Sequence, residues 1–221
     1  IAIDVEEGGR RLIRVTDNGE GMAPEDALAC FERHATSKVY QPDDLFSIKT
    51  LGFRGEALPS IASVARVSLR SRTADASSAS ELRIDAGVLQ DQRPAAQPGA
   101  GTTVEVRDLF FNVPARRRFL RTEATELAQA QRLVERLVLS RADVSFRLRH
   151  VARTLIDAAA AADPAAAEQR IAKLLGAEFL GAARRIDQTI GPVRLHGWLG
   201  APTAARAQGE PLLPQFFGSW I

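Results

Sequence analysis

The chain has 221 residues, of which 45% are hydrophobic, and a formal net charge of +2 at pH 7, so its composition is that of a folded protein and excludes an intrinsically disordered one. Cys30 is the single cysteine, which excludes an internal disulfide and a cysteine-based metal cluster. No apolar run approaches the roughly 18 residues of a membrane span and no signal peptide pattern opens the chain, so we expect a cytoplasmic protein.

Alternating apolar residues predict a β-hairpin at the start of the chain. Residues 1–6 and 12–16 each place apolar side chains at every second position, and residues 7–10 supply a glycine-containing turn between them. Pro24, followed by two acidic residues, then predicts the first turn of a short helix, because proline lacks the N–H that a first turn leaves unpaired and acids suit the positive end of the helix dipole.

The second strand of the hairpin runs into residues 17–21, with the sequence DNGEG. Short Asx side chains and glycines favour an ordinary turn at such a place. Alternatively, Asp17 projects from the end of the strand and accepts a hydrogen bond from a ligand's amino group, while Gly19 and Gly21 let the ligand lie against the backbone. The residues alone leave both interpretations open.

Residues 34–50 lose helical periodicity and are predicted to form a long loop, a kind of segment that is commonly functional. Thr36, Ser37 and Lys38 in this loop offer two hydroxyl groups and an ammonium group that can close over phosphates. Simple exposure of Lys38 to solvent is the alternative.

Two glycines and an arginine precede the next predicted helix, residues 56–64. Gly52 and Gly55 permit a tight turn and a close approach of the backbone to a ligand, and Arg54 can contact phosphate oxygens through two N–H groups at once. The first N–H groups of the helix would face the same place. This arrangement predicts a phosphate-binding loop, and an ordinary turn before a helix is the alternative.

The rest of the chain alternates between strand and helix patterns. The predicted strands are residues 67–73, 81–86, 102–106, 144–149, 154–158 and 193–199; the predicted helices are residues 123–140 and 168–175, the second ending at Gly176. Residues 74–80, 92–101 and 202–214 are predicted to be loops, with residues 92–101 a surface excursion. The alanine-rich residues 158–167 mark the clearest change in composition and predict a domain boundary.

Arginines gather after residues 108–114, at Arg116, Arg117, Arg118 and Arg121. Contact with a polyanion such as nucleic acid and a solvated helix face are equally good interpretations of charge alone. The histidines, His34, His150 and His196, lie far apart in the sequence without metal-ligand spacing, so we predict no metal site.

Three blocks of sequence closely resemble the ATPase region of the MutL family of DNA mismatch repair proteins, part of the wider group that includes gyrase B, Hsp90 and histidine kinases. The blocks are residues 17–21, residues 33–38 together with 51–58, and residues 101–117. The resemblance implies an α/β sandwich of the Bergerat type, a mixed and mostly antiparallel sheet with helices on one face. It further implies an ATP-binding domain over residues 1–160, followed over residues 165–221 by the start of an α+β domain like ribosomal protein S5.

The resemblance also implies roles for individual residues. Asp17 would accept a hydrogen bond from the adenine amino group, with Gly19 and Gly21 at the base pocket and the Thr102 hydroxyl supporting the same contact. The triphosphate, with its Mg²⁺, would be held under a nucleotide-ordered lid by Thr36, Ser37, Lys38, Gly52, Phe53, Arg54 and Gly55.

The family's catalytic residues are not expected in this chain. Its general-base glutamate and its Mg²⁺-binding asparagine lie on a helix before the first hairpin, and its phosphate-sensing lysine lies beyond the position of Ile221. We therefore expect a fragment with no catalytic residue of its own, which hydrolyses ATP weakly or not at all.

The function implied by the resemblance is that of an ATP-driven switch, in which ATP binding orders the lid and joins two N-terminal regions into a homodimer and hydrolysis resets them. The implied partners are ATP, mismatched or non-specific DNA and a mismatch-recognition protein of the MutS type, in the bacterial cytoplasm at the nucleoid. Two alternatives remain: a DNA-binding or scaffold fragment without ATPase activity, and a relative such as gyrase B.

Overall fold

The computed structural model of the chain describes residues 1–33, 35, 52, 54–191, 193–200 and 216–217. The chain divides into two compact units, residues 1–129 with 148–155 and residues 130–147 with 156–221. None of the described helices combines the length and the apolar character needed to cross a membrane.

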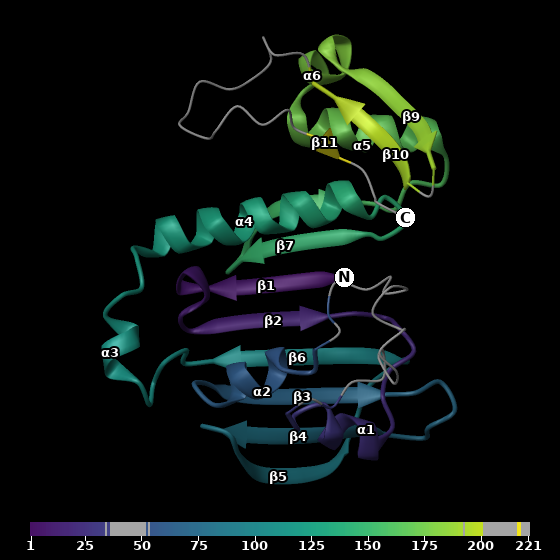
Figure 1. The fold of residues 1–221 in the computed structure, drawn as a ribbon. Coiled ribbons are helices and arrows are strands. Elements are labelled where there is room, and N and C mark those ends of the chain that lie inside the picture. The colour runs from purple at the N-terminus through teal and green to yellow at the C-terminus, as the bar shows by residue number, and fades with distance from the viewer. Residues whose placement is uncertain (34, 36–51, 53, 192, 201–215, 218–221) are drawn as a thin grey trace. The chain divides into compact units, whose positions relative to one another are not determined.

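An eight-stranded sheet dominates the fold, with the strand order β5-β4-β3-β6-β2-β1-β7-β8 (Figure 1). The five neighbouring pairs from β5 to β1 are antiparallel, whereas β1 and β7 point the same way in Figure 1, so the sheet is mixed and mostly antiparallel as predicted. The strands are β1 (Ala2–Glu6), β2 (Leu12–Thr16), β3 (Arg66–Arg72), β4 (Ala79–Asp85), β5 (Val88–Ala95), β6 (Gly101–Arg107), β7 (Phe146–His150) and β8 (Arg153–Ala158).

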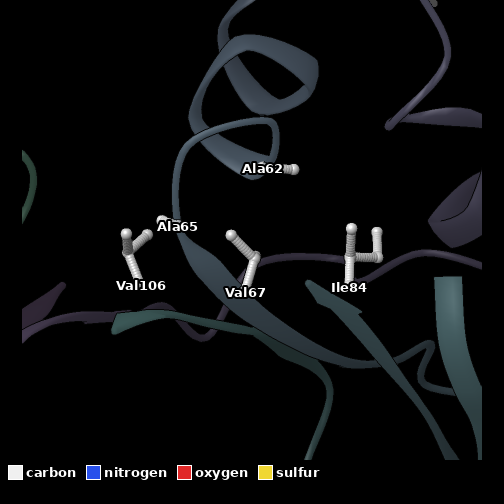
Figure 2. Close-up of a cluster of buried hydrophobic side chains, with 5 residues drawn as sticks. All are labelled: Ala62, Ala65, Val67, Ile84 and Val106. Carbon is white, nitrogen blue, oxygen red and sulfur yellow. The ribbon is translucent and has the colours of Figure 1, made fainter. Parts of the chain in front are cut away.

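Two short helices cover one face of this sheet, α1 (Pro24–Ala29) and α2 (Ala57–Ala62). In Figure 2 the sheet residues Val67, Ile84 and Val106 point toward Ala62 of α2. A neighbouring cluster places Ala27 of α1 with Leu69 and Leu82, whose side chains are fully buried. Burying one such leucine stabilises the fold by about 1.5–3 kcal/mol. Because alternate side chains of a strand point to the same face, burial of this face explains why apolar residues recur at every second position.

The opposite face of the strands is charged. Glu81 is 5% exposed and lies between Arg70 and Arg93, each of which places a guanidinium nitrogen 2.9 Å from a carboxylate oxygen of Glu81. These ion pairs hold the pKa of Glu81 below its usual value, with the hydrogen bond from Arg70 as the largest cause. Arg14 of β2 likewise pairs with Glu105 of the neighbouring strand β6 at 2.8 Å.

The prediction that residues 92–101 form a surface excursion is wrong for their first part. Residues up to Ala95 belong to strand β5, which pairs with β4 at the edge of the sheet. Most side chains of β5 are exposed, so the strand buries neither face and lacks the alternation by which strands are recognised. Pro94 is tolerated because an edge strand leaves one row of backbone groups unpaired in the sheet.

Four more helices and a small sheet follow along the chain. The helices are α3 (Pro114–Arg117), α4 (Glu123–Ser140), α5 (Pro164–Leu175) and α6 (Ala177–Ala182). The small sheet has the order β11-β10-β9, with strands β9 (Arg184–Ile190), β10 (Val193–Leu199) and β11 (Phe216–Phe217). The prediction of α4 is confirmed, whereas α6 and β9 had not been predicted. The predicted loop of residues 202–214 lies outside the described residues.

Helix α5 begins four residues earlier than the predicted helix of residues 168–175, inside the alanine-rich segment. Asp163 caps it, because its Oδ1 accepts a hydrogen bond from Ala166 N at 2.8 Å. Gly176, at φ +95°, ends it in the predicted place. The division into domains at residues 160–165 stays a prediction.

A buried arginine, Arg170 of α5, ties together parts of the second unit. It is 7% exposed, and its guanidinium donates hydrogen bonds to four carbonyl oxygens: those of Val138 and Arg141, in and just after the last turn of α4, and those of Ala158 and Ala159, at the last residue of β8 and the next one. The last carbonyls of a helix have no partner within it and carry the negative end of its dipole. Arg170 therefore places a positive charge against these carbonyls and satisfies the buried ones, those of Val138 and Ala158.

Candidate functional site

The carboxylate of Asp17 is fixed where β2 ends. Its Oδ1 accepts hydrogen bonds from Gly19 N at 2.9 Å and from Thr102 N at 3.1 Å, while the Asp17 amide donates to the Thr102 carbonyl oxygen at 2.9 Å. The bond from Gly19 is that of an Asx turn, so the turn interpretation is correct. The other oxygen, Oδ2, makes no hydrogen bond within the described part of the chain. One oxygen thus builds the turn and the second remains an acceptor for a ligand.

Side-chain hydroxyls meet beside this carboxylate. Ser71 of β3 is 1% exposed, and its Oγ lies 2.9 Å from the Oγ1 of Thr102 in β6. The Met22 amide donates to the same Ser71 Oγ at 2.8 Å. The Asp17 loop, residues 17–22, is therefore anchored at its start to Thr102 and at its end to Ser71.

Two glycines allow this close assembly. Gly21 has φ +74°, and a Cβ atom there would lie 1.9 Å from the Arg72 carbonyl oxygen. Gly101 has φ +131°, and its Cβ would lie 2.3 Å from the Asp17 carbonyl oxygen. Both distances are far inside van der Waals contact, so each position needs glycine to let two stretches of main chain approach. Gly21 was predicted to line a base pocket, but glycine is already required at this position for the loop to pack against Arg72.

The second predicted glycine loop lies before α2. Gly55 has φ +62°, and a Cβ there would lie 2.2 Å from the Ala35 carbonyl oxygen, whereas a Cβ on Gly52 would meet nothing within 4 Å. The structure thus brings Gly55 against the residue before Thr36, and Arg54 is exposed. Thr36, Ser37, Lys38 and Phe53 lie outside the described residues.

The arginine set, Arg116, Arg117, Arg118 and Arg121, lies on and after helix α3. All four side chains are exposed, and none of them forms an ion pair with another described residue. Phe119, between them, is 85% exposed. A group of unpaired arginines around an exposed ring is a surface suited to a polyanion that carries aromatic groups.

His150 and Cys30 each make a hydrogen bond within the protein. The Nε2 of His150 lies 3.0 Å from Glu123 Oε1, and Cys30 donates from Sγ to the Ala27 carbonyl oxygen at 3.2 Å. Burial raises the pKa of the Cys30 thiol to about 11, so the thiolate nucleophile is not populated at neutral pH. Among the described residues, no three His, Cys, Asp or Glu side chains gather in a way that would hold a metal ion.

Residue-by-residue reasoning had not identified Ser71 and Gly101 as parts of the site. The available signal for Ser71 is its place in β3, where it takes a buried position that follows Val67 and Leu69 in the alternation. A polar side chain at an inward position of a strand needs a hydrogen-bond partner, so this position indicates a polar contact in the interior.

The chain was compared with known protein families, curated sequences and solved structures. No family model matches the chain. The chain is 47% identical over 220 residues to the DNA mismatch repair protein MutL of Pseudomonas entomophila, and the match covers 98% of this chain and 34% of the relative. It is 48% identical over 211 residues to MutL of Herminiimonas arsenicoxydans, where the match covers 95% of this chain and 34% of the relative. The chain thus spans about a third of the length of these curated relatives.

Solved structures agree. The Aquifex aeolicus MutL ATPase domain complexed with ADP is 27% identical, has a TM-score of 0.64, and is matched over 95% of this chain and 70% of its own. The ATPase region of Saccharomyces cerevisiae topoisomerase II, with 12% identity and a TM-score of 0.57, shares the fold alone. Identity of nearly one residue in two along almost the whole chain, joined to this fold, shows that the chain belongs to the MutL family of DNA mismatch repair proteins, in the region of the family's ATPase domain.

Proposed function

We propose that this chain is the ATP-binding module of a MutL-like mismatch repair protein. The observation that carries the proposal is the Asp17 carboxylate, held at a strand end by two backbone amides with Oδ2 left as an acceptor. An amino group on a flat aromatic base is a fitting donor for that oxygen. The Aquifex relative, whose ATPase domain was solved with ADP, supports a nucleotide as the ligand.

The rigidity of the Asp17 loop favours recognition over an accidental turn. Gly21 brings the main chain of the loop against the end of β3, Gly101 brings the start of β6 against Asp17, and Ser71 and Thr102 hold the loop by hydrogen bonds. A ligand that binds to a preformed group loses little free energy to ordering the protein. The base would therefore be recognised before any part of the chain has to move.

In this proposal the triphosphate is held by Thr36, Ser37, Lys38 and the segment from Gly52 to Gly55, which includes Phe53 and Arg54. The arginine supplies a charge with two parallel N–H donors, and the glycines allow the backbone to approach. Bound Mg²⁺ would neutralise part of the phosphate charge. These residues would order a lid, and the ordered lid would form the surface through which two N-terminal regions dimerise; hydrolysis would release it.

A second proposed function is non-specific DNA contact through the arginine set, which the absence of ion pairs around these four side chains in the described chain favours. Phosphate contacts of this kind bind mismatched and matched DNA alike. Recognition of a mismatch would then belong to a partner of the MutS type, in the bacterial cytoplasm. A scaffold that binds DNA without ATP is the competing function.

Equilibrium binding of ATP by calorimetry tests the first proposal. The wild-type chain should bind ATP, and Asp17→Asn should weaken binding about 10- to 100-fold, which corresponds to about 1.4–2.7 kcal/mol for a hydrogen bond to a charged acceptor. Asp91→Asn is the matched control, because Asp91 lies on the edge strand β5 away from the Asp17 loop. ATP binding that Asp17→Asn and Asp91→Asn leave equally intact would refute the role of Asp17.

A further inference from the structure

Asn18 and Gly19 form the single Asn–Gly pair of the sequence, in the middle of the Asp17 loop. Both residues are exposed, and the Asn18 side-chain amide makes no hydrogen bond with another described residue. Asn112 is the other asparagine of the chain. Its Nδ2 donates to the Ser63 carbonyl oxygen at 2.9 Å, and the branched side chain of Val113 follows it. The two asparagines thus differ in the freedom of the side-chain amide and in the residue that follows.

An asparagine side chain reacts with the backbone nitrogen of the next residue when the two can meet. The nitrogen bonds to the side-chain carbonyl carbon, Cγ, and loses its proton, while the side-chain NH2 group takes up a proton and leaves as ammonia. The product is a five-membered succinimide ring, which water then opens at either carbonyl carbon to give aspartate or isoaspartate. Glycine in second place favours ring closure, because it has no Cβ to crowd the nitrogen and lets the backbone turn. Water is the single co-reactant, and Asn18 is exposed to it.

A hydrogen bond in the loop opposes this reaction. Gly19 N donates to Asp17 Oδ1 at 2.9 Å, so the nitrogen must leave that oxygen before it can turn toward Asn18 Cγ. The carboxylate cannot follow, because its Oδ1 also accepts from the Thr102 amide at 3.1 Å. The bond should slow the reaction about 10- to 100-fold, which corresponds to about 1.4–2.7 kcal/mol for a hydrogen bond to a charged acceptor.

We propose that Asn18 is a site of spontaneous deamidation through attack by the Gly19 nitrogen, and that Asp17 is a positioning residue that slows the reaction by holding this nitrogen. The Asp17 carboxylate thus has a second task besides contact with a ligand, which is to keep its own loop chemically intact. The deamidation does not depend on what the loop binds. Its effect on ATP binding rests on the proposed function.

Isoaspartate at position 18 would not fit the folded loop. Its backbone runs through the former side chain, so the chain is one carbon longer at this residue. The main chain here is closely packed, since a Cβ on Gly101 would lie 2.3 Å from Asp17 O and 2.9 Å from Asn18 Cα. The longer backbone would draw Gly19 N away from Asp17 Oδ1, and both products add a negative charge beside Asp17. In the proposed function this charge repels the triphosphate.

The first test follows the wild-type chain by peptide mass spectrometry, which detects the mass gain when the side-chain NH2 becomes OH. In the folded chain Asn18 should react at least about 10-fold faster than Asn112, because branched Val113 hinders the turn that Gly19 permits. In urea, where the bond to Asp17 is lost, Asn18 should react about 10- to 100-fold faster than in the folded chain. Equal rates for Asn18 in the folded and the urea-unfolded chain would overturn the inference.

The second test removes the acceptor of the Gly19 proton. Folded Asp17→Ala should deamidate at Asn18 about 10- to 100-fold faster than the wild type. Asp91→Ala is the matched control, because Asp91 lies on the edge strand β5, and its rate should stay within twofold of the wild-type rate. An unchanged rate in Asp17→Ala with a native circular dichroism spectrum would overturn the role of Asp17. The comparison in urea needs no variant, so it tests the same role if Asp17→Ala does not fold.

ATP separates this inference from the proposed function. Saturating ATP should slow deamidation of Asn18 in the wild type at least about 10-fold, since a ligand on Asp17 holds the loop closed, and chain converted at Asn18 should bind ATP about 10-fold more weakly than fresh chain. A chain that deamidates as expected but does not bind ATP would refute the proposed function and leave the inference standing. A chain that binds ATP through Asp17 but keeps Asn18 unmodified even in urea would overturn the inference alone.

Discussion

Replacement of Arg170 by methionine should strongly destabilise the second unit. Three of its hydrogen bonds are short enough to count fully: Nη2 to Val138 O at 2.9 Å, Nη2 to Arg141 O at 3.1 Å, and Nη1 to Ala159 O. A hydrogen bond to a charged group contributes about 1.5–3 kcal/mol, so the three together contribute about 5–9 kcal/mol. Removing the charge also recovers several kcal/mol of desolvation cost, the same burial that lowers the pKa of Arg170.

The net loss should be about 3–5 kcal/mol, as is typical when one partner of a buried charged contact is removed. Trp198 lies on β10 in the second unit, so its fluorescence during urea unfolding reports on that unit. With a urea dependence of about 2–3 kcal/mol/M, the midpoint should fall by about 1–2.5 M. Lys173→Met is the control, because exposed Lys173 makes one hydrogen bond, to Asp157 O, and should cost under about 1 kcal/mol. Equal midpoints for Arg170→Met and Lys173→Met would refute this account of the unit.

Three further predictions concern the first unit. Gly21 has φ +74°, and a Cβ there would lie 1.9 Å from Arg72 O, so Gly21→Ala should lower the free energy of unfolding by at least about 2 kcal/mol in a thermal melt. Gly52→Ala is the control, because its Cβ meets nothing within 4 Å, and it should change the free energy of unfolding by under about 0.5 kcal/mol. Similar melting temperatures for the two variants would contradict the close approach at Gly21. The Glu81 carboxylate has a lowered pKa, so its ion pairs stabilise the fold above its ordinary pKa of about 4.5 and lose this effect as pH falls through the lower folded value. Glu81→Gln should therefore cost about 1–2 kcal/mol at pH 7 and progressively less below pH 4.5, and a pH-independent difference would argue against the pairs. For duplex DNA, each glutamine substitution in the arginine set should reduce the slope of the logarithm of the binding constant against the logarithm of the salt concentration by about 0.9. Arg194→Gln is the control and should leave the slope nearly unchanged, because Arg194 is already paired with Asp187. Identical slopes for all variants would show that DNA binds elsewhere.

The strands that pack against helices were predictable because one face is buried and the other charged. Residues such as Val67 and Leu69 alternate with Arg66 and Arg70, and that alternation is written directly in the sequence. Strand β5 was not predictable, because an edge strand with exposed side chains has no such period. The start of α5 was missed for another reason. Alanine is the best helix former, but a run of alanines has no alternation of polar and apolar side chains, so residues 164–167 were taken as part of a domain boundary.

The candidate site divides in the same way. Asp17 and Thr102 were found through the pattern that they share with a family, and the structure brings them into direct contact. The contribution of Ser71 could not be inferred, since a serine in a strand is ordinary until its three partners from distant segments are known. The requirement for glycine at position 101 likewise depends on the approach of Asp17, which only the folded chain defines.

The most direct measurement of nucleotide recognition is the change in backbone amide chemical shifts when ATP is added to the isotope-labelled chain. The account expects the largest changes at the amides of Gly19, Met22 and Thr102, which donate to Asp17 or Ser71, and little change along the edge strand β5. Asp17→Asn should remove this pattern at the same ATP concentration. Shifts confined to the arginine set, with the Asp17 loop unaltered at saturating ATP, would contradict the assignment of the nucleotide site.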